Sequence, residues 1–156
     1  MTTFAEVFEE EVRQIKVFDG YAVEIGVFES ENVRDKTSVT NAQLMYLHEN
    51  GAPAKNIPPR PVLRLSIDYL SSTLWPKTRE YILDRIFKDH WGQAEIEKEL
   101  MQMCKRLRSY AKYKVIGEGK MLAKLKHRKG IPLKDTGDLQ RSIRCVLLKN
   151  GQIIGP

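Results

Sequence analysis

The chain has 156 residues, of which 42% are hydrophobic, 29% charged and 8% aromatic, and its formal net charge is +6. This composition is typical of a globular domain that is long enough to fold without disulfides or metal ions. No run of about 18 apolar residues is present, and the acidic N-terminal sequence is unlike a signal peptide. We therefore expect no membrane span and no export. The only cysteines, Cys104 and Cys145, are expected to be free thiols in a reducing compartment.

Positive charge is concentrated towards the C-terminus. The first fifty residues carry a net charge of −6, the next fifty +1 and the remainder +11. Ten Lys and Arg lie between Lys105 and Lys129, with Glu118 as the single acid among them. Such a block is typical of a surface that binds nucleic acid or an acidic protein, and equally of a solvated basic face. Opposite charge at the two ends of a subunit also favours head-to-tail stacking of copies.

The N-terminal sequence predicts a helix followed by a strand. Thr3 and Glu6 form a capping box, and Asp19 with Gly20 ends the helix. Between them lies an apolar stripe at helical spacing, formed by Phe4, Val7, Phe8, Val12 and Ile15. Residues 21–28 then alternate between apolar and other side chains, which predicts a half-buried strand.

A loop and a short capped helix come next. Residues 30–40 are polar and have no apolar periodicity, which indicates a loop. Thr40 and Gln43 are spaced as a second capping box. The helix that they begin is expected to end at Asn50-Gly51, since glycine accepts the backbone conformation that closes helices.

Residues 51–61 contain three prolines in four positions, which predicts an extended, semi-rigid segment because each proline fixes its own φ and restricts the residue before it. Pro61 is suitably placed as the first residue of another helix. The inward face of that helix is expected to consist of Leu63, Ile67 and Leu70.

The helical pattern breaks or restarts at Pro76 and then continues to about Asp89. A further helix is expected to begin near Gln93 and to run into the basic block. Residues 110–130 have too few large apolar side chains at either period, so a mobile basic loop or arm is expected there, ordered only against a partner.

The C-terminal sequence predicts a β-hairpin. Residues 143–148 are mainly aliphatic, and Asn150-Gly151 separates them from residues 152–154. Asn-Gly is a strong hairpin signal because both turn positions must accept positive φ. This hairpin and the early strand are expected to form a small antiparallel sheet packed with several helices, an α+β fold. Residues 1–156 are expected to be a single domain with a basic, mobile segment at about 105–130.

Patterns typical of catalytic sites are incomplete. The Asp-Thr-Gly triplet at 135–137 is found in aspartic proteases, but the second signature at Ile153 follows too closely to leave room for a flap. Residues 117–120 lack the spacing and the hydroxyl residue of a phosphate-binding loop. The three histidines are far apart and have no ligand spacing. We expect no enzyme activity, no metal and no cofactor.

Two segments carry a more specific signal. Residues 47–53 read LHENGAP and residues 57–64 read IPPRPVLR, while residues 132–143 read PLKDTGDLQRSI. In this order the segments resemble the tail-completion and neck proteins of tailed bacteriophages, which include head–tail joining, minor tail and virion-morphogenesis proteins. In that group a helix ending in E-x-G leads to PxRPFL and a long helix, and L-x-D-T-G-x-L-x-x-S-I leads to a terminal hairpin. Val62 stands here where the group commonly has Phe.

The resemblance implies a structural protein of the virion that is made in the host cytoplasm and forms or completes the ring at the head–tail junction. Its implied partners are copies of itself in a cyclic ring, expected to be a hexamer, and connector or adaptor and tail terminator or tail tube proteins, with packaged DNA in the lumen and no membrane. The alternative is a soluble protein that binds nucleic acid without sequence specificity through residues 105–129. In that case Tyr110 and Tyr113 are candidates for base stacking.

Candidate residues come from the two motifs and the basic block. Arg60 can present a bidentate fork to a carboxylate or a phosphate, and its segment is either a subunit contact or an internal brace. The candidate subunit or partner contacts are Pro58, Pro59, Arg60 and Pro61. The second motif is expected to cap and bend a helical turn and to fill one core, through Asp135, Thr136, Gly137, Leu139, Ser142 and Ile143. The candidate DNA-phosphate contacts are Lys120, Lys124, Lys126, Arg128 and Lys129.

Overall fold

A computed structural model describes residues 9, 16–31, 38–124, 133 and 137–156. The expected N-terminal helix lies largely outside these residues, although Glu9 and Lys16 are helical. The expected loop over 30–40 also lies partly outside them, and its beginning belongs to a 3-10 turn, Glu29–Glu31.

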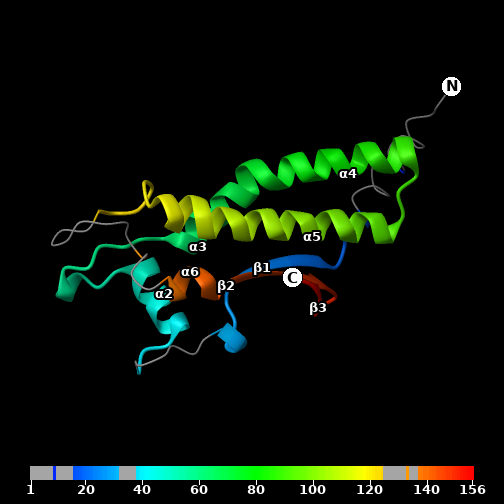
Figure 1. Cartoon of the computed structure of the whole chain (residues 1–156). Coiled ribbons are helices and arrows are strands. Elements are labelled where there is room, and N and C mark those ends of the chain that lie inside the picture. Colours follow the sequence, from blue (N-terminus) through cyan, green and yellow to red (C-terminus); the bar gives the residue numbers. More distant parts are fainter. Residues whose placement is uncertain (1–8, 10–15, 32–37, 125–132, 134–136) are drawn as a thin grey trace.

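Three strands form one antiparallel sheet in the order β1-β2-β3 (Figure 1). β1 (Tyr21–Val27) pairs along its whole length with β2 (Ile143–Lys149), and β2 also pairs with β3 (Gln152–Gly155). Asn150 and Gly151 connect β2 to β3 with φ of 50° and 79°, as a two-residue hairpin with two positive φ angles requires. The expected hairpin, and its pairing with the early strand, are confirmed.

A long helical hairpin covers one face of this sheet (Figure 1). Its first arm is continuous from α3 (Val62–Tyr69) through a π-helical turn, η3 (Leu70–Leu74), into α4 (Trp75–Asp89). Its second arm is α5 (Gln93–Ser109), which continues as a π-helical segment, η4 (Tyr110–Gly117). Apolar side chains of α5 pack against β2, so the fold is α+β as expected.

Two shorter helices lie at the end of the molecule away from the hairpin tip (Figure 1). α2 (Asn41–Asn50) begins with the expected capping box: Gln43 N donates to Thr40 Oγ1 at 3.2 Å, and Thr40 N donates to Gln43 Oε1 at 3.0 Å. α6 (Asp138–Ser142) leads directly into β2. A 3-10 turn, Pro53–Lys55, follows α2.

The core consists of two clusters of buried side chains. The first joins the short helices to α3 and η4, and includes Met45, Val62, Ala111, Val115, Ile116, Leu122, Leu133, Leu139 and Ile143. The second fills the space between α4, α5 and the sheet, and includes Leu74, Ile82, Ile96, Leu100, Met103, Cys104, Leu107, Cys145 and Leu147. The first cluster therefore brings together segments from the middle and the end of the chain.

The expectation of a loop over residues 110–130 is wrong for residues 110–117. This stretch continues α5 as η4, and Ala111, Val115 and Ile116 are fully buried. The apolar pattern of this stretch does not indicate a helix, because alanine contributes little to such a pattern and a π-helical turn changes the period from 3.6 residues. Residues 125–130 lie outside the described part of the chain.

Two expectations about the proline-rich segment also need correction. Residues 53–55 form a 3-10 turn inside a closed loop rather than an extended stretch, and the helix begins at Val62 with Pro61 as its cap. Val62 and Ser66 form the buried face of α3, whereas Ile67 is 44% exposed. Of the expected inward residues, Leu63 and Leu70 are half-buried and pack against the two core clusters, so only Ile67 departs from the expectation.

Among the helices that the structure describes, none is both long enough and apolar enough to cross a bilayer.

Candidate assembly surface

The carboxylate of Glu49, one residue before the end of α2, caps the N-terminus of α3. Its two oxygens accept hydrogen bonds from the backbone N–H of Leu63 and of Arg64, the latter at 3.4 Å. Pro61, the local cap residue, makes no side-chain capping bond, so Glu49 supplies both the acceptor and the negative charge that a helix N-terminus favours. This contact gives the glutamate of the first motif a structural role.

Gly51 allows the chain to turn back from α2. It has φ of 72°, its N–H donates to Leu47 O at 2.7 Å, and an added Cβ would lie 2.8 Å from Ile57 O. The chain from Ala52 to Ile57 then forms a closed loop, since the backbone groups of these two residues bond each other at 2.9 and 3.1 Å. A side chain at Gly51 would meet both an unfavourable φ and a close contact.

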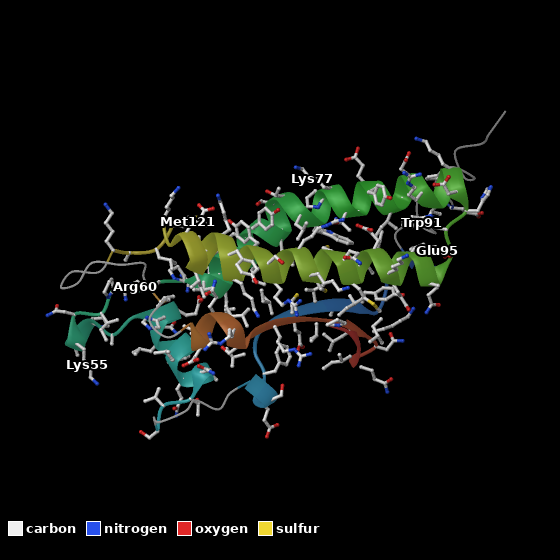
Figure 2. All side chains as sticks on the ribbon, in the orientation of Figure 1. Lys55, Arg60, Lys77, Trp91, Glu95 and Met121 are labelled. Atoms are coloured by element: carbon white, nitrogen blue, oxygen red, sulfur yellow. The ribbon has the colours of Figure 1, made fainter. Side chains whose placement is uncertain are left out.

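Arg60 is an internal brace in this chain. It is only 6% exposed, its Nε donates to Ala123 O at 2.9 Å, and its backbone N donates to His48 O at 2.6 Å. These bonds tie the proline-rich segment to α2 and to the chain after η4. Lys55 lies at the outer end of the loop that precedes Arg60 (Figure 2). The side chains of this segment that are open to a partner are those of Pro53, Ala54, Lys55, Asn56 and Pro59.

The second motif folds as a bend, a single helical turn and a strand start. Gly137 has φ of 79°, as expected for a tight bend. Leu139 and Ile143 are both buried in the first core cluster, and Ser142 lies where α6 ends, with its Oγ donating to Leu139 O at 2.9 Å. These three expectations are confirmed. Asp135 and Thr136 lie outside the described residues.

The two motifs belong to one packed unit. Val62 of the first motif and Leu139 of the second share the first core cluster. Side chains fasten α6 to η4 as well, because Gln140 Nε2 donates to Lys112 O at 2.6 Å and Lys112 Nζ donates to Arg141 O at 2.9 Å. Segments about seventy residues apart in sequence therefore form a single end of the molecule.

The basic block is partly neutralised within the fold. Glu118 lies 2.9 Å from Lys114 Nζ and 3.8 Å from Lys120 Nζ, and the hydrogen bond from Lys114 lowers the pKa of Glu118. Arg106 pairs with Glu99 at 3.1 Å. The side chain of Lys120 remains 82% exposed, and Lys124 is exposed. The other three candidate phosphate contacts, Lys126, Arg128 and Lys129, lie outside the described residues.

The two tyrosines of the basic block differ in their surroundings. Tyr110 stacks on Tyr69 with ring centroids 3.9 Å apart and an interplanar angle of 9°, so this ring face is occupied within the protein. Tyr113 is 67% exposed and is the ring of the pair that a partner can reach. On α2, Tyr46 is exposed to a similar degree.

A cluster that the sequence analysis did not anticipate joins the sheet to α5. Tyr21 Oη donates to Glu97 Oε1 at 2.7 Å, and Lys149 Nζ donates to Tyr21 Oη at 2.7 Å and lies 3.3 Å from Glu97 Oε1. The bonds from Tyr21 and from Gln93 lower the pKa of Glu97, and burial raises the pKa of Tyr21. The register of β1 on β2 could have paired Tyr21 with Lys149, but no local pattern points to Glu97.

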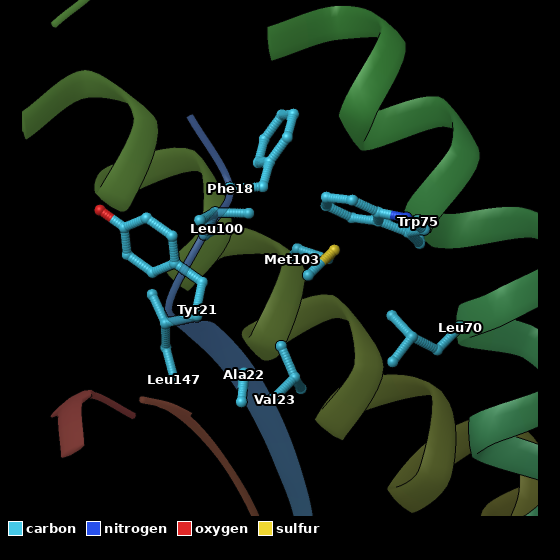
Figure 3. A pocket seen from close by; sticks show the side chains of 9 residues that line it. All are labelled: Phe18, Tyr21, Ala22, Val23, Leu70, Trp75, Leu100, Met103 and Leu147. Carbon is cyan, nitrogen blue, oxygen red and sulfur yellow. The ribbon is translucent and has the colours of Figure 1, made fainter. Parts of the chain in front are cut away.

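An apolar cavity of about 240 Å³ lies between β1 and the helical hairpin (Figure 3). Its lining residues are Phe18, Tyr21, Ala22, Val23, Leu70, Trp75, Leu100, Met103 and Leu147. Apart from the Tyr21 hydroxyl, these side chains have no group capable of acid–base chemistry. In the described part of the chain, no three His, Cys, Asp or Glu side chains lie close enough together to hold a metal ion.

No protein-family model, curated protein or solved structure matches this chain.

Proposed function

We propose that the protein is a non-enzymatic structural component of a tailed-phage virion, which forms or completes the ring at the head–tail junction and joins the connector to the tail. The observation that supports this most is the packing of the two motif segments into one unit. The residues that carry the resemblance to neck and tail-completion proteins are the same residues that build this end of the molecule.

We assign the partner contact to the loop at this end. Its tip, Pro53–Lys55, is exposed, whereas its base is held by the Ala52–Ile57 pairing and by Arg60. A rigid base lowers the entropy lost when an exposed loop binds a partner. In a cyclic ring each subunit uses two different surfaces, so this loop meets a different face of its neighbour or of the connector.

The positive charge around Lys120 and Lys124 supports a place for packaged DNA beside this end of the subunit. Contact with phosphates through lysine is independent of base sequence, as a ring that surrounds a passing genome requires.

Light scattering tests the proposal. The protein is measured alone and after mixing with purified tails, and separately with DNA-filled heads; co-migration with one particle in a fixed copy number is expected. Lys55→Glu, at the loop tip, is expected to weaken this binding. Lys77→Glu makes the same charge change on the exposed face of α4 and serves as the control (Figure 2). If neither particle binds the protein, the proposal is wrong.

Non-specific nucleic-acid binding is the alternative from a different class, supported by the exposed Lys120, Lys124 and Tyr113. Electrostatic binding is already weak at about 150 mM salt. If the protein binds neither heads nor tails but shifts the mobility of bare duplex DNA at this salt concentration, the result would favour the alternative.

A further inference from the structure

The cavity between β1 and the helical hairpin has a buried apolar floor and an aromatic rim. Leu100, Met103 and Leu147 form the floor and are at most 2% exposed. Phe18 and Trp75 lie at the rim, where they are half-buried and meet edge to face with ring centroids 5.1 Å apart. The volume of about 240 Å³ therefore lies between the closed interior and side chains that border solvent, through which a small molecule can enter.

The π-helical turn η3 builds one wall of this cavity. The backbone N–H of Trp75 donates to Leu70 O, five residues earlier. In an α-helix, residues five apart point in directions that differ by roughly 140°, whereas a bond from i to i+5 brings them towards one side. Leu70 and Trp75 accordingly both line the cavity. Turns of this kind are rare and are found frequently at functional sites, which distinguishes this hollow from a chance gap in the packing.

The lining leaves a ligand little to form a hydrogen bond with. The Tyr21 hydroxyl is engaged with Glu97 and Lys149, and it points away from the other lining side chains (Figure 3). Among the described residues that line the cavity, the remaining side chains are apolar except for the indole N–H of Trp75 and the sulfur of Met103. A charged ligand would lose its hydration here without replacement, so the ligand must be uncharged and largely apolar.

The size and the ring content of the cavity favour an aromatic ligand. An apolar cavity of about 150 Å³ stays dry and takes up benzene, so about 240 Å³ holds one ring or two fused rings. Phe18, Tyr21 and Trp75 stand around the hollow, where they can pack edge to face on a bound ring (Figure 3). The Met103 sulfur also contacts aromatic rings favourably. An alkyl group would gain from burial alone.

We propose that this cavity is a binding site for a small, uncharged aromatic molecule. The ligand contacts the chain before β1, both arms of the helical hairpin, and β2, so its binding stabilises the arrangement of these segments. The site belongs to the single chain and does not depend on the proposed place in a virion.

Thermal unfolding of the full chain with benzene as the probe tests the proposal. A ligand that binds only the folded state raises Tm, and benzene at ten times its Kd should raise it by about 4 °C. Cyclohexane also has six carbons but no π electrons, so its effect at the same free concentration should be smaller. Benzoate keeps the ring but carries a charge, and it should give no rise.

Tryptophan fluorescence supplies a second measurement at the site itself. The chain has two tryptophans, and Trp91 is not among the lining residues. Trp91→Phe therefore leaves Trp75, at the rim, as the single reporter. Its emission should change with benzene along a saturable curve that gives Kd.

Two matched variants locate the binding. Leu70→Phe places a ring of the chain's own in the cavity and is expected to weaken benzene binding at least tenfold. Ile67→Phe makes the same kind of enlargement three residues earlier, at a side chain that is 44% exposed and does not line the cavity. This control should bind benzene as the wild type does.

Three results would overturn the proposal: no rise in Tm and no saturable fluorescence change with benzene, equal benzene affinity in Leu70→Phe and wild type, or a rise with cyclohexane as large as that with benzene. Self-association of the wild type that Leu70→Phe abolishes, measured by light scattering, would show that a second copy fills the cavity, and the proposal would again be wrong. Should Leu70→Phe fail to fold, the comparison of benzene with cyclohexane on the wild type still decides.

Discussion

Glu49 is a single side chain that holds two helices in a fixed relation. Replacing it with alanine leaves the first N–H groups of α3 without their acceptor, so we expect Glu49→Ala to lose about 1–2 kcal/mol of unfolding free energy. Glu49→Gln keeps a hydrogen-bond acceptor without the charge, so its unfolding free energy should lie between those of wild type and Glu49→Ala. Urea denaturation measures both changes.

The control for this change is Glu80→Ala, which removes an exposed glutamate from α4. Its effect should stay within about 0.5 kcal/mol. Equal losses at the two positions would contradict the assignment of Glu49 as a cap.

The Tyr21–Glu97–Lys149 cluster makes stability depend on pH. The hydrogen bond from Tyr21 is the largest cause of the lowered pKa of Glu97 in the folded protein. A carboxyl with a depressed folded pKa stabilises the protein above its unfolded pKa, and that stability is lost as pH falls through the folded value. We therefore expect wild type to lose more stability than Tyr21→Phe between about pH 5 and pH 3.

Urea midpoints measured at several pH values test this expectation, with Tyr46→Phe as the control because that ring is exposed on α2. Parallel pH profiles for wild type and Tyr21→Phe would show that the bond does not stabilise the ionised carboxyl. At alkaline pH the dependence of stability on pH is reversed. The pKa values of Tyr21 and Lys149 are raised in the folded protein, so these groups stabilise it below their unfolded pKa values, and this stability is lost as pH rises above about 10.

At the scale of the element, η4 is a packed part of the core. Val115 is fully buried there, so Val115→Ala should lower the unfolding free energy by about 2 kcal/mol. Tyr113→Ala, in the same turn but exposed, should change it by less than about 0.5 kcal/mol. Amide hydrogen exchange over residues 110–117 should be as slow as in α5; exchange at the rate of an unstructured peptide would contradict the observed packing.

Elements with local signals could be predicted from the sequence, and those with distant causes could not. The Thr40–Gln43 capping box and the Asn150-Gly151 hairpin depend on residues within four positions of one another, and both are confirmed. The helical nature of η4 depends on burial of small residues against α3 and α6, which are distant in sequence. No count of large apolar residues within the segment could have shown it.

The same limit applies to the candidate surface as a whole. The sequence placed Arg60 in a motif but left open whether it faces a partner or the interior, because that depends on where Ala123 lies in the fold. The charge gradient likewise overstated the free positive charge, since Glu118 and Glu99 each pair with bases of the block. Motif residues can thus be located from sequence, whereas their partners are set by the arrangement of the whole molecule.

The pairing of β1 with β2 has a consequence for the order of events during synthesis. Tyr21 and Lys149 face each other across this ladder although they are 128 positions apart. A nascent chain can form the helical hairpin on the ribosome, but β1 has no strand to pair with until β2 has left the exit tunnel. Closure of such a distant contact is slow compared with helix formation, so the emerging hairpin exposes its apolar face in the meantime. The sheet can therefore close only after β2 has been synthesised, well after the hairpin has been able to form.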